Sequence, residues 1–318
     1  MEPLAGTLVA DFTRYLPGPF ASRELLERGA RVVRIETPEG DPLRSVAPGW
    51  DAALNAGKES VVWDLERDPE LGRALCARAD VVLEGFRPGA AERLGVGAAD
   101  VPESVVYCSI TGFGADDGRA GHDLNYVGWA GLLEDTAPAL PPVQIADLAG
   151  GALYAVVEIL SALLERERSG HGKHITVSMT DNAHRLATHR LHGEPEQTLT
   201  GALACYRIYE TGDGRYLTIT PVEPKFWRRL CELIGRADLV ELQYQQDQEA
   251  LAAELGAVFH TRPLGDWLEL FEGEDVMAGP VATLAEAAKW LGTTSPPAPA
   301  PALGEHTEEW RRRLGDAA

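Results

Sequence analysis

The first third of the chain alternates short apolar runs with helix-forming stretches, and this alternation limits the possible folds more than any other feature. The runs that we predict to be strands are Leu8–Phe12, Arg31–Glu36, Ser60–Leu65, Val81–Glu84 and Val105–Ile110. Helix-forming segments separate most of them, and parallel strands need such crossover connections. We therefore predict an α/β fold in which helices cover both faces of a mostly parallel, Rossmann-like sheet.

A long amphipathic helix is predicted later in the chain. Leu148–Arg168 carries apolar residues three and four positions apart, and Gly170 follows it. Asp147 would then lie at the helix N-terminus, where unpaired N–H groups and the helix dipole stabilise a carboxylate. From position alone, a plain capping residue explains Asp147 better than a catalytic one.

The chain is long enough for two domains. We predict a large domain from residues 1–200 and 300–318, and a small, shortened α+β domain over 201–284. The small domain is expected to contain the strand Tyr216–Thr220 and helices around Phe226–Ile234, Glu249–Phe259 and Leu264–Phe271. Residues 285–299 would form the linker that returns the chain to the large domain, where the tail residues 303–314 would pack.

Composition excludes several classes of partner. The formal net charge is −20, which argues against nucleic acid or an anionic membrane as a partner. We see no secretion signal and no segment that approaches membrane-spanning length, so we expect a cytoplasmic protein. The four cysteines form no CxxC pair, and the histidines lack metal-ligand spacing, so we expect buried free thiols and no metal.

Two titratable residues in glycine-bordered motifs suggest proton-transfer chemistry. His122 lies in the segment Gly121–Tyr126, and Asp147 lies in the segment Ala146–Gly151. An imidazole and a carboxylate can take and return protons on opposite faces of one carbon, which is what inversion of a stereocentre beside a carbonyl requires. His122 suits this role near neutral pH, whereas Asp147 would need its pKa raised by burial.

Nearly the whole chain resembles the class III CoA-transferase family. The resemblance is carried by these segments, which stand in the family's order: Asp11-Phe12-Thr13-Arg14, Gly29–Glu36, Phe86-Arg87-Pro88-Gly89, Glu92-Arg93-Leu94-Gly95, Ser109–Gly114, Ser169–Lys173, Gly279-Pro280-Val281 and Leu303–Thr307. No single segment would be sufficient, but their number and order make the assignment specific. The resemblance implies an interlocked homodimer that acts on acyl thioesters of CoA without a tightly bound cofactor.

Within that family, the chain is most similar to the alpha-methylacyl-CoA racemase-like branch. The Gly-His-Asp-x-Asn-Tyr motif that contains His122 is intact, and Glu223 stands at the position of the glutamate that assists the racemase histidine. The resemblance implies that His122 and Asp147 are the acid/base pair and that Glu223 supports His122. Backbone N–H groups near Asp123 would stabilise the enolate oxygen. In the family's transferases, the residue matching Asp147 is instead a nucleophile.

Several departures from the family pattern affect the nucleotide side of the substrate. Basic residues that contact CoA phosphates in the family are replaced here by Thr37, Ala56, Glu59 and Glu66, while Arg87 and Lys58 remain as candidate contacts. We therefore expect weak CoA affinity. The region after Val281 is also shorter than in the family, and an opened pocket would suit a substrate carried by an acyl carrier protein.

The leading hypothesis is a racemase or epimerase that acts on the α-carbon of a 2-methylacyl thioester by two-base proton transfer. Two alternatives remain open: an acyl-CoA transferase with Asp147 as the nucleophile, and a degenerate family member that only binds or serves as a scaffold. The intact set His122, Asp147 and Glu223 favours the first hypothesis, whereas Ala56, Glu59 and Glu66 favour the last.

Overall fold

The computed structural model divides the chain into two compact units. The first consists of Met1–His189 with Pro296–Ala318, and the second consists of Arg190–Ser295. The structure describes residues 2–67, 69–191, 198–245, 247–293 and 298–315. Each unit is described by itself below.

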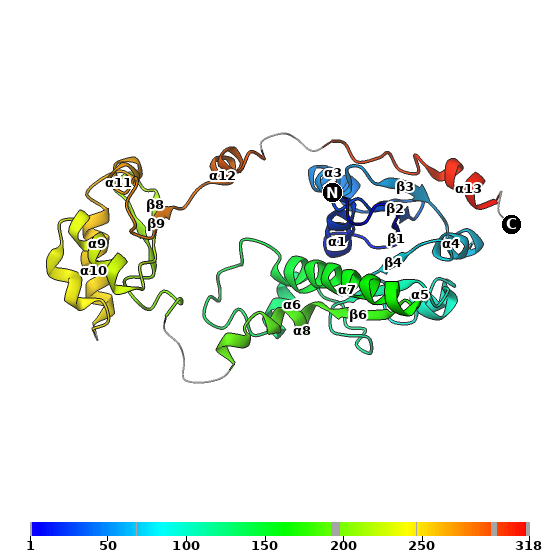
Figure 1. Ribbon diagram of the computed structural model, residues 1–318, viewed down its shortest axis with the longest axis horizontal. Coiled ribbons are helices and arrows are strands. Elements are labelled where there is room, and N and C mark those ends of the chain that lie inside the picture. The colour runs from blue at the N-terminus through cyan, green and yellow to red at the C-terminus, as the bar shows by residue number, and fades with distance from the viewer. Residues whose placement is uncertain (1, 68, 192–197, 246, 294–297, 316–318) are drawn as a thin grey trace. The chain divides into compact units, whose positions relative to one another are not determined.

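A six-stranded, all-parallel sheet forms the centre of the first unit (Figure 1). Its strands are β1 (Leu8–Asp11), β2 (Arg31–Glu36), β3 (Glu59–Val62), β4 (Val81–Glu84), β5 (Val106–Thr111) and β6 (His174–Ser178). Their spatial order is β3-β2-β1-β4-β5-β6, so the chain moves outward from β1 in one direction and then in the other. The predicted parallel α/β architecture is confirmed, and the strand β6, which the sequence did not suggest, completes it.

Helices surround this sheet in the first unit. They are α1 (Pro17–Leu26), α2 (Leu43–Val46), α3 (Pro48–Asn55), α4 (Pro69–Cys76), α5 (Ala90–Arg93), α6 (Asp123–Trp129), α7 (Tyr154–Ser169), α8 (Met179–Arg185) and α13 (Thr307–Gly315). Short 3₁₀ turns occur at η1 (Ala98–Asp100) and η3 (Thr188–Arg190), the latter at the boundary between the two units.

Both faces of the sheet are buried, and consecutive residues of each strand serve opposite faces. Val81 and Leu83 of β4 belong to one hydrophobic cluster, which also contains Ile159 of α7. Val82 belongs to the cluster on the other face, together with Trp310 of α13. This two-sided burial explains why the strand sequences are almost continuously apolar. All four cysteines are buried and free, as predicted.

The predicted helix over Leu148–Arg168 is longer and begins differently. A π-helical segment, η2 (Ala146–Leu153), precedes α7 and continues into it. The joined run Ala146–Ser169 is long and apolar enough, by length and composition, to cross a membrane. The expectation that no segment approaches that length was therefore wrong. The run also packs against β5 and β6, and a core helix passes the same test.

The C-terminal tail packs on the edge strand β3 of the first unit. The N–H of His306 donates to the Ser60 carbonyl at 2.9 Å, and the N–H of Val62 donates to the Thr307 hydroxyl at 3.0 Å. Trp310 is buried and its indole N–H donates to the Glu59 carboxylate at 2.6 Å. These contacts cover hydrogen-bonding groups that an edge strand would otherwise leave open.

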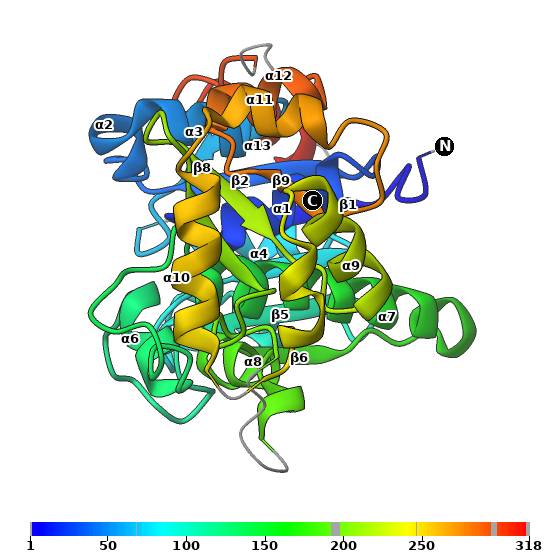
Figure 2. The same ribbon diagram turned by 90° about the vertical axis from the view of Figure 1, so that its left-hand side faces the viewer.

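The second unit is a small α+β body with its own core (Figure 2). Its antiparallel sheet has the order β7-β8-β9, with β7 (Arg207–Glu210), β8 (Tyr216–Ile219) and β9 (Ala278–Pro280). Its helical segments are α9 (Pro224–Leu233), the 3₁₀ segment η4 (Ala237–Leu242), α10 (Gln248–Phe259), α11 (Leu264–Leu270) and α12 (Leu284–Leu291). Helix α12 occupies most of the first half of the expected linker 285–299, so that part of the linker is not extended. The rest of the predicted linker includes residues 294–297, which lie outside the described residues.

Candidate active site

Asp147 lies on the wide π-helical turn that opens the long helix. It is the second residue of η2, and no N–H donates to its carboxylate among the described residues, so it is not a simple helix cap. Burial, and then the negative charge of Asp123, raise the pKa of Asp147 from 3.8 to about 7. A carboxyl group with this pKa is able to exchange protons in both directions near neutral pH.

Glycines bring η2 close to its neighbours. A Cβ atom on Gly150 would lie 2.6 Å from the Met179 carbonyl oxygen and 3.0 Å from the Ala183 nitrogen, both in helix α8. Any larger residue at position 150 would push α8 away. The Asn182 side chain in the same helix donates to the Gly150 carbonyl at 3.0 Å. A Cβ atom on Gly151 would likewise lie 2.9 Å from the Met179 side chain, so both glycines of the Asp147 motif serve the packing of η2 against α8.

Asp123 connects the histidine motif to Asp147. It is the first residue of α6, and its carboxylate accepts a hydrogen bond from the backbone N–H of Asp147 at 2.9 Å. Helix α6 is held in turn by Tyr126, whose hydroxyl donates to the Gly121 carbonyl at 2.6 Å. The motif thus places a second carboxylate against the Asp147 backbone, which the sequence analysis did not anticipate.

His122 occupies the N-cap position of α6 and is exposed. Its backbone N–H donates to the Asn125 side-chain oxygen at 3.0 Å, which fixes the start of the helix. His122 directly precedes Asp123, and α6 packs against η2. The two motifs that the sequence singled out therefore meet in the first unit, although 25 residues separate His122 from Asp147 along the chain.

Glu223 belongs to the second unit. It precedes Pro224 at the N-terminus of α9, and its side chain is exposed. Its negative charge contributes, after burial and the charge of Cys205, to a raised pKa of Tyr244. The pairing of Glu223 with His122 remains a prediction.

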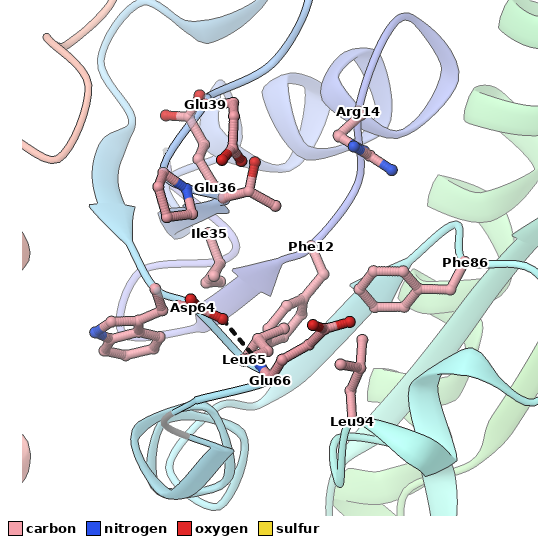
Figure 3. Close-up of a pocket in the computed structure, with 13 residues that line it drawn as sticks. Phe12, Arg14, Ile35, Glu36, Glu39, Asp64, Leu65, Glu66, Phe86 and Leu94 are labelled. Carbon is pink, nitrogen blue, oxygen red and sulfur yellow. Dashed lines mark hydrogen bonds between the residues drawn. The ribbon is translucent and has the colours of Figure 1, made fainter.

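A separate pocket of about 300 Å³ lies where the strands β1 to β4 end (Figure 3). Its apolar lining is Phe12, Ile35, Pro38, Trp63, Leu65, Phe86 and Leu94. Its polar lining is Arg14, Glu36, Thr37, Glu39, Asp64 and Glu66. Ligands of open parallel sheets bind at this carboxyl edge, so the pocket is a candidate binding site. The sequence analysis singled out Thr37 and Glu66 but missed Arg14 and Glu39, which lie shortly after the ends of β1 and β2.

The candidate phosphate contact Lys58 is in the wrong place for that role. Its side chain is completely buried, and its ammonium donates to the Pro19 carbonyl at 2.9 Å, the Ser22 hydroxyl at 2.7 Å and the Asn55 side chain at 2.8 Å. Its nitrogen also lies 3.7 Å from the Asp11 carboxylate. Burial lowers the pKa of Lys58 to about 8. An enclosed ammonium with these partners is a structural group, so the expected phosphate contact is corrected.

The remaining candidates on the nucleotide side differ in exposure. Arg87 directly follows the pocket residue Phe86, and its side chain is exposed to solvent. Glu59 is not part of the pocket lining. Two hydrogen bonds from the Arg31 guanidinium, at 2.7 and 2.9 Å, hold its carboxylate. Glu59, one of the residues that replace basic phosphate contacts of the family, therefore carries a charge that is already paired with Arg31.

Comparisons with known proteins identify the family. The model of CoA-transferase family III matches residues 4–294. The human alpha-methylacyl-CoA racemase is 31% identical over 308 residues, which cover 89% of this chain and 78% of the human protein. The probable fatty acyl-CoA transferase Rv3272 of Mycobacterium tuberculosis is 33% identical over 324 residues, covering 87% of this chain and 82% of that protein.

Solved structures agree with this assignment. The crystal structure of Rv3272 in its orthorhombic form has a TM-score of 0.82 at 29% identity, covering 98% of this chain and 99% of that chain. A CAIB/BAIF family protein from Brucella suis has a TM-score of 0.81 at 28% identity, with the same coverage. Since the family model matches almost the whole sequence and the fold agrees over nearly its full length, the chain belongs to CoA-transferase family III.

Proposed function

We propose that the protein is a racemase or epimerase that inverts the α-carbon of a 2-methylacyl thioester. The observation that carries this proposal is the meeting of the two motifs: α6, which begins directly after His122, packs against η2, and the Asp123 carboxylate accepts the Asp147 N–H at 2.9 Å. Burial and the charge of Asp123 raise the pKa of Asp147 to about 7, and a group that both removes and returns a proton works best when its pKa is near the operating pH.

In the proposed reaction, Asp147 removes the α-proton from one face of the thioester and His122 delivers a proton to the other face. The reverse direction exchanges the two roles. The charge that develops on the thioester oxygen needs donors, and the N–H groups of Asp123 and Leu124 at the start of α6 have no partner within their own helix. Glu223 would orient His122 or share its proton.

The test is proton exchange into a 2-methylacyl thioester of N-acetylcysteamine in heavy water. We expect the wild type to incorporate deuterium at the α-carbon. Asp147→Asn and His122→Gln should each reduce exchange by about 10²–10⁴-fold, and each should affect one stereochemical direction more strongly. The matched control is His171→Gln, which alters an exposed histidine outside the two motifs.

The alternative that relatives named as CoA-transferases support is acyl transfer through Asp147. A parallel assay of acyl transfer between two CoA species distinguishes the two activities. If His122→Gln retains full acyl transfer, Asp147→Asn abolishes it and the wild type does not exchange the α-proton, the transferase hypothesis replaces the racemase hypothesis.

We also propose that the protein acts as a homodimer. Large apolar side chains remain open to solvent in the single chain. Val157 and Leu164 on α7 are 56% and 59% exposed, and Leu284 and Trp290 on α12 are 91% and 85% exposed. A second copy would remove this surface from water. Light scattering on the purified protein at micromolar concentration tests this, and a monomer would contradict it.

A further inference from the structure

The pocket in Figure 3 lies at the point where the strand order of the sheet reverses. The chain builds β2 and β3 on one side of β1, and then crosses to build β4, β5 and β6 on the other. Phe12 follows β1 and Phe86 follows β4, so the pocket opens between the two strands that diverge. In sheets of this kind, that crevice is where nucleotides bind.

The apolar part of the pocket offers one face to a planar base. The half-buried Phe86 ring packs on the buried Phe12 ring, with 6.3 Å between their centroids and a tilt of 50°, and Leu65 and Leu94 lie beside them. Aromatic side chains offer stacking surface to any base. The proposed substrate class contains a nucleotide when its carrier is CoA, and the adenosine of that carrier is the group this part of the pocket would take.

The carboxylates of the pocket fall into two groups: those paired with an arginine and those without an ion pair. Glu36 and Asp64 belong to the first group. Burial pushes the pKa of Glu36 upward, but the hydrogen bond from Arg44, the charge of Arg34 and the Ser60 hydroxyl outweigh it, and the pKa is lowered. Glu36 is therefore ionised and already paired with Arg44, at 2.7 and 2.6 Å. Asp64 pairs with Arg67 at 3.2 Å.

Two further carboxylates are left without an ion pair among the described residues. They are Glu39 and Glu66, both exposed at the pocket wall, and Figure 3 shows the Glu66 carboxylate turned toward Phe86 and Leu94. Arg14 is the pocket's unpaired cation among the same residues. Among the lining residues, the unpaired charges are therefore two carboxylates against one guanidinium, in a chain whose net charge is −20, and the exposed Arg87 lies outside the lining.

A phosphate monoester carries close to two negative charges at neutral pH, so this wall opposes the 3′-phosphate on the ribose of CoA. A free ribose diol, by contrast, donates hydrogen bonds to carboxylates. Dinucleotide-binding sheets use the same distinction: an acidic residue accepts a hydrogen bond from a ribose hydroxyl, and an arginine donates hydrogen bonds to a ribose phosphate. Here the residues that follow β2 are Thr37 and Glu39, and neither is basic.

We propose that this pocket determines carrier specificity by favouring an adenosine whose ribose carries no 3′-phosphate, with Glu39 and Glu66 as the discriminating residues. This inference rests on the proposed thioester function and names the carrier that the same enzyme prefers. Dephospho-CoA has this chemistry, and CoA does not.

The test is calorimetric titration of the intact protein with CoA and with dephospho-CoA at low and high salt. We expect the wild type to bind dephospho-CoA at least threefold more tightly than CoA. The variant with Glu39→Lys and Glu66→Lys should prefer CoA, by up to about fivefold for each reversed charge, and high salt should reduce both preferences. The matched control is Glu103→Lys, which reverses an exposed charge outside the pocket and should leave the ratio unchanged.

Equal affinity for the two ligands, or tighter binding of CoA by the wild type, overturns the proposal. Failure of both ligands to bind also overturns it and indicates a carrier without adenosine, such as the phosphopantetheine of an acyl carrier protein. Exchange into the N-acetylcysteamine thioester, which contains no nucleotide, separates the two hypotheses. If the wild type exchanges the α-proton but does not bind dephospho-CoA more tightly than CoA, only the carrier proposal fails. If the wild type does not exchange the α-proton, the proposed function fails.

Discussion

The carboxylate of Asp123 accepts the backbone N–H of Asp147 at 2.9 Å, and this contact joins the two motifs that carry the proposed chemistry. The same carboxylate is the second cause, after burial, of the raised pKa of Asp147. One residue thus holds the backbone of the proposed base and also adds to its proton affinity.

Replacing Asp123 with asparagine should shift the pH dependence of exchange. The amide oxygen can still accept the Asp147 N–H, but the negative charge that raises the pKa of Asp147 is removed. The pKa of Asp147 should fall, so its carboxylate stays ionised at lower pH. The acidic limb of the kcat/KM profile should therefore move to lower pH. Profiles of wild type, Asp123→Asn and the exposed control Asp116→Asn test this; identical acidic limbs would argue against an electrostatic role of Asp123.

Asp147→Asn should stabilise the folded protein although it strongly reduces exchange. The ordinary pKa of 3.8 is raised to about 7 in the fold, so the folded state holds this proton more tightly than the unfolded chain. The wild type therefore loses stability as pH rises from about 4 to about 7. The neutral amide does not suffer this loss, so the variant should be more stable than the wild type at neutral pH. Each gain of about 1 kcal/mol in the free energy of unfolding should raise Tm by roughly 2–4 °C. Thermal unfolding should show a larger gain at pH 8 than at about pH 5, and an equal or negative difference would contradict the buried-carboxylate explanation.

Lys58→Ala should destabilise the protein without acting on CoA directly. The change removes three hydrogen bonds and leaves the buried Asp11 without its neighbouring cation. Loss of one partner from a buried pair typically costs about 3–5 kcal/mol. Urea unfolding measures this cost, with the exposed Lys289→Ala as control. Unchanged stability combined with weaker CoA binding would restore Lys58 as a phosphate ligand.

Charge reversal should destabilise the fold at Glu59 but not at Glu66. Glu59→Arg places a cation beside Arg31 and removes the acceptor of the Trp310 indole, so it should lower the free energy of unfolding by on the order of 2–3 kcal/mol. Glu66→Arg changes an exposed pocket residue and should leave stability within about 0.5 kcal/mol. Urea unfolding gives the free energy of unfolding of both variants. Equal losses would show that Glu59 and Glu66 do not differ in burial and pairing as the structure indicates.

The strands and the main motifs were predictable because they depend on local patterns. Continuous apolar runs such as Val81–Glu84 indicate strands buried on both faces, and helix periodicity located most of α7. The number and order of short segments along the chain, from Asp11–Arg14 to Leu303–Thr307, were also sufficient to indicate the family, which the comparisons confirm.

The environment of individual side chains was decided only by the tertiary structure. The sequence made Lys58 a candidate phosphate contact, but α1 and α3 enclose it. It made Glu59 one of the lost basic contacts, whereas the structure pairs the Glu59 carboxylate with Arg31 and Trp310. Desolvation and charge pairing depend on distances between residues far apart in the chain, and periodicity carries no information about those distances. The raised pKa of Asp147 arises in the same way, because it requires the packing of α6 and α8 around η2.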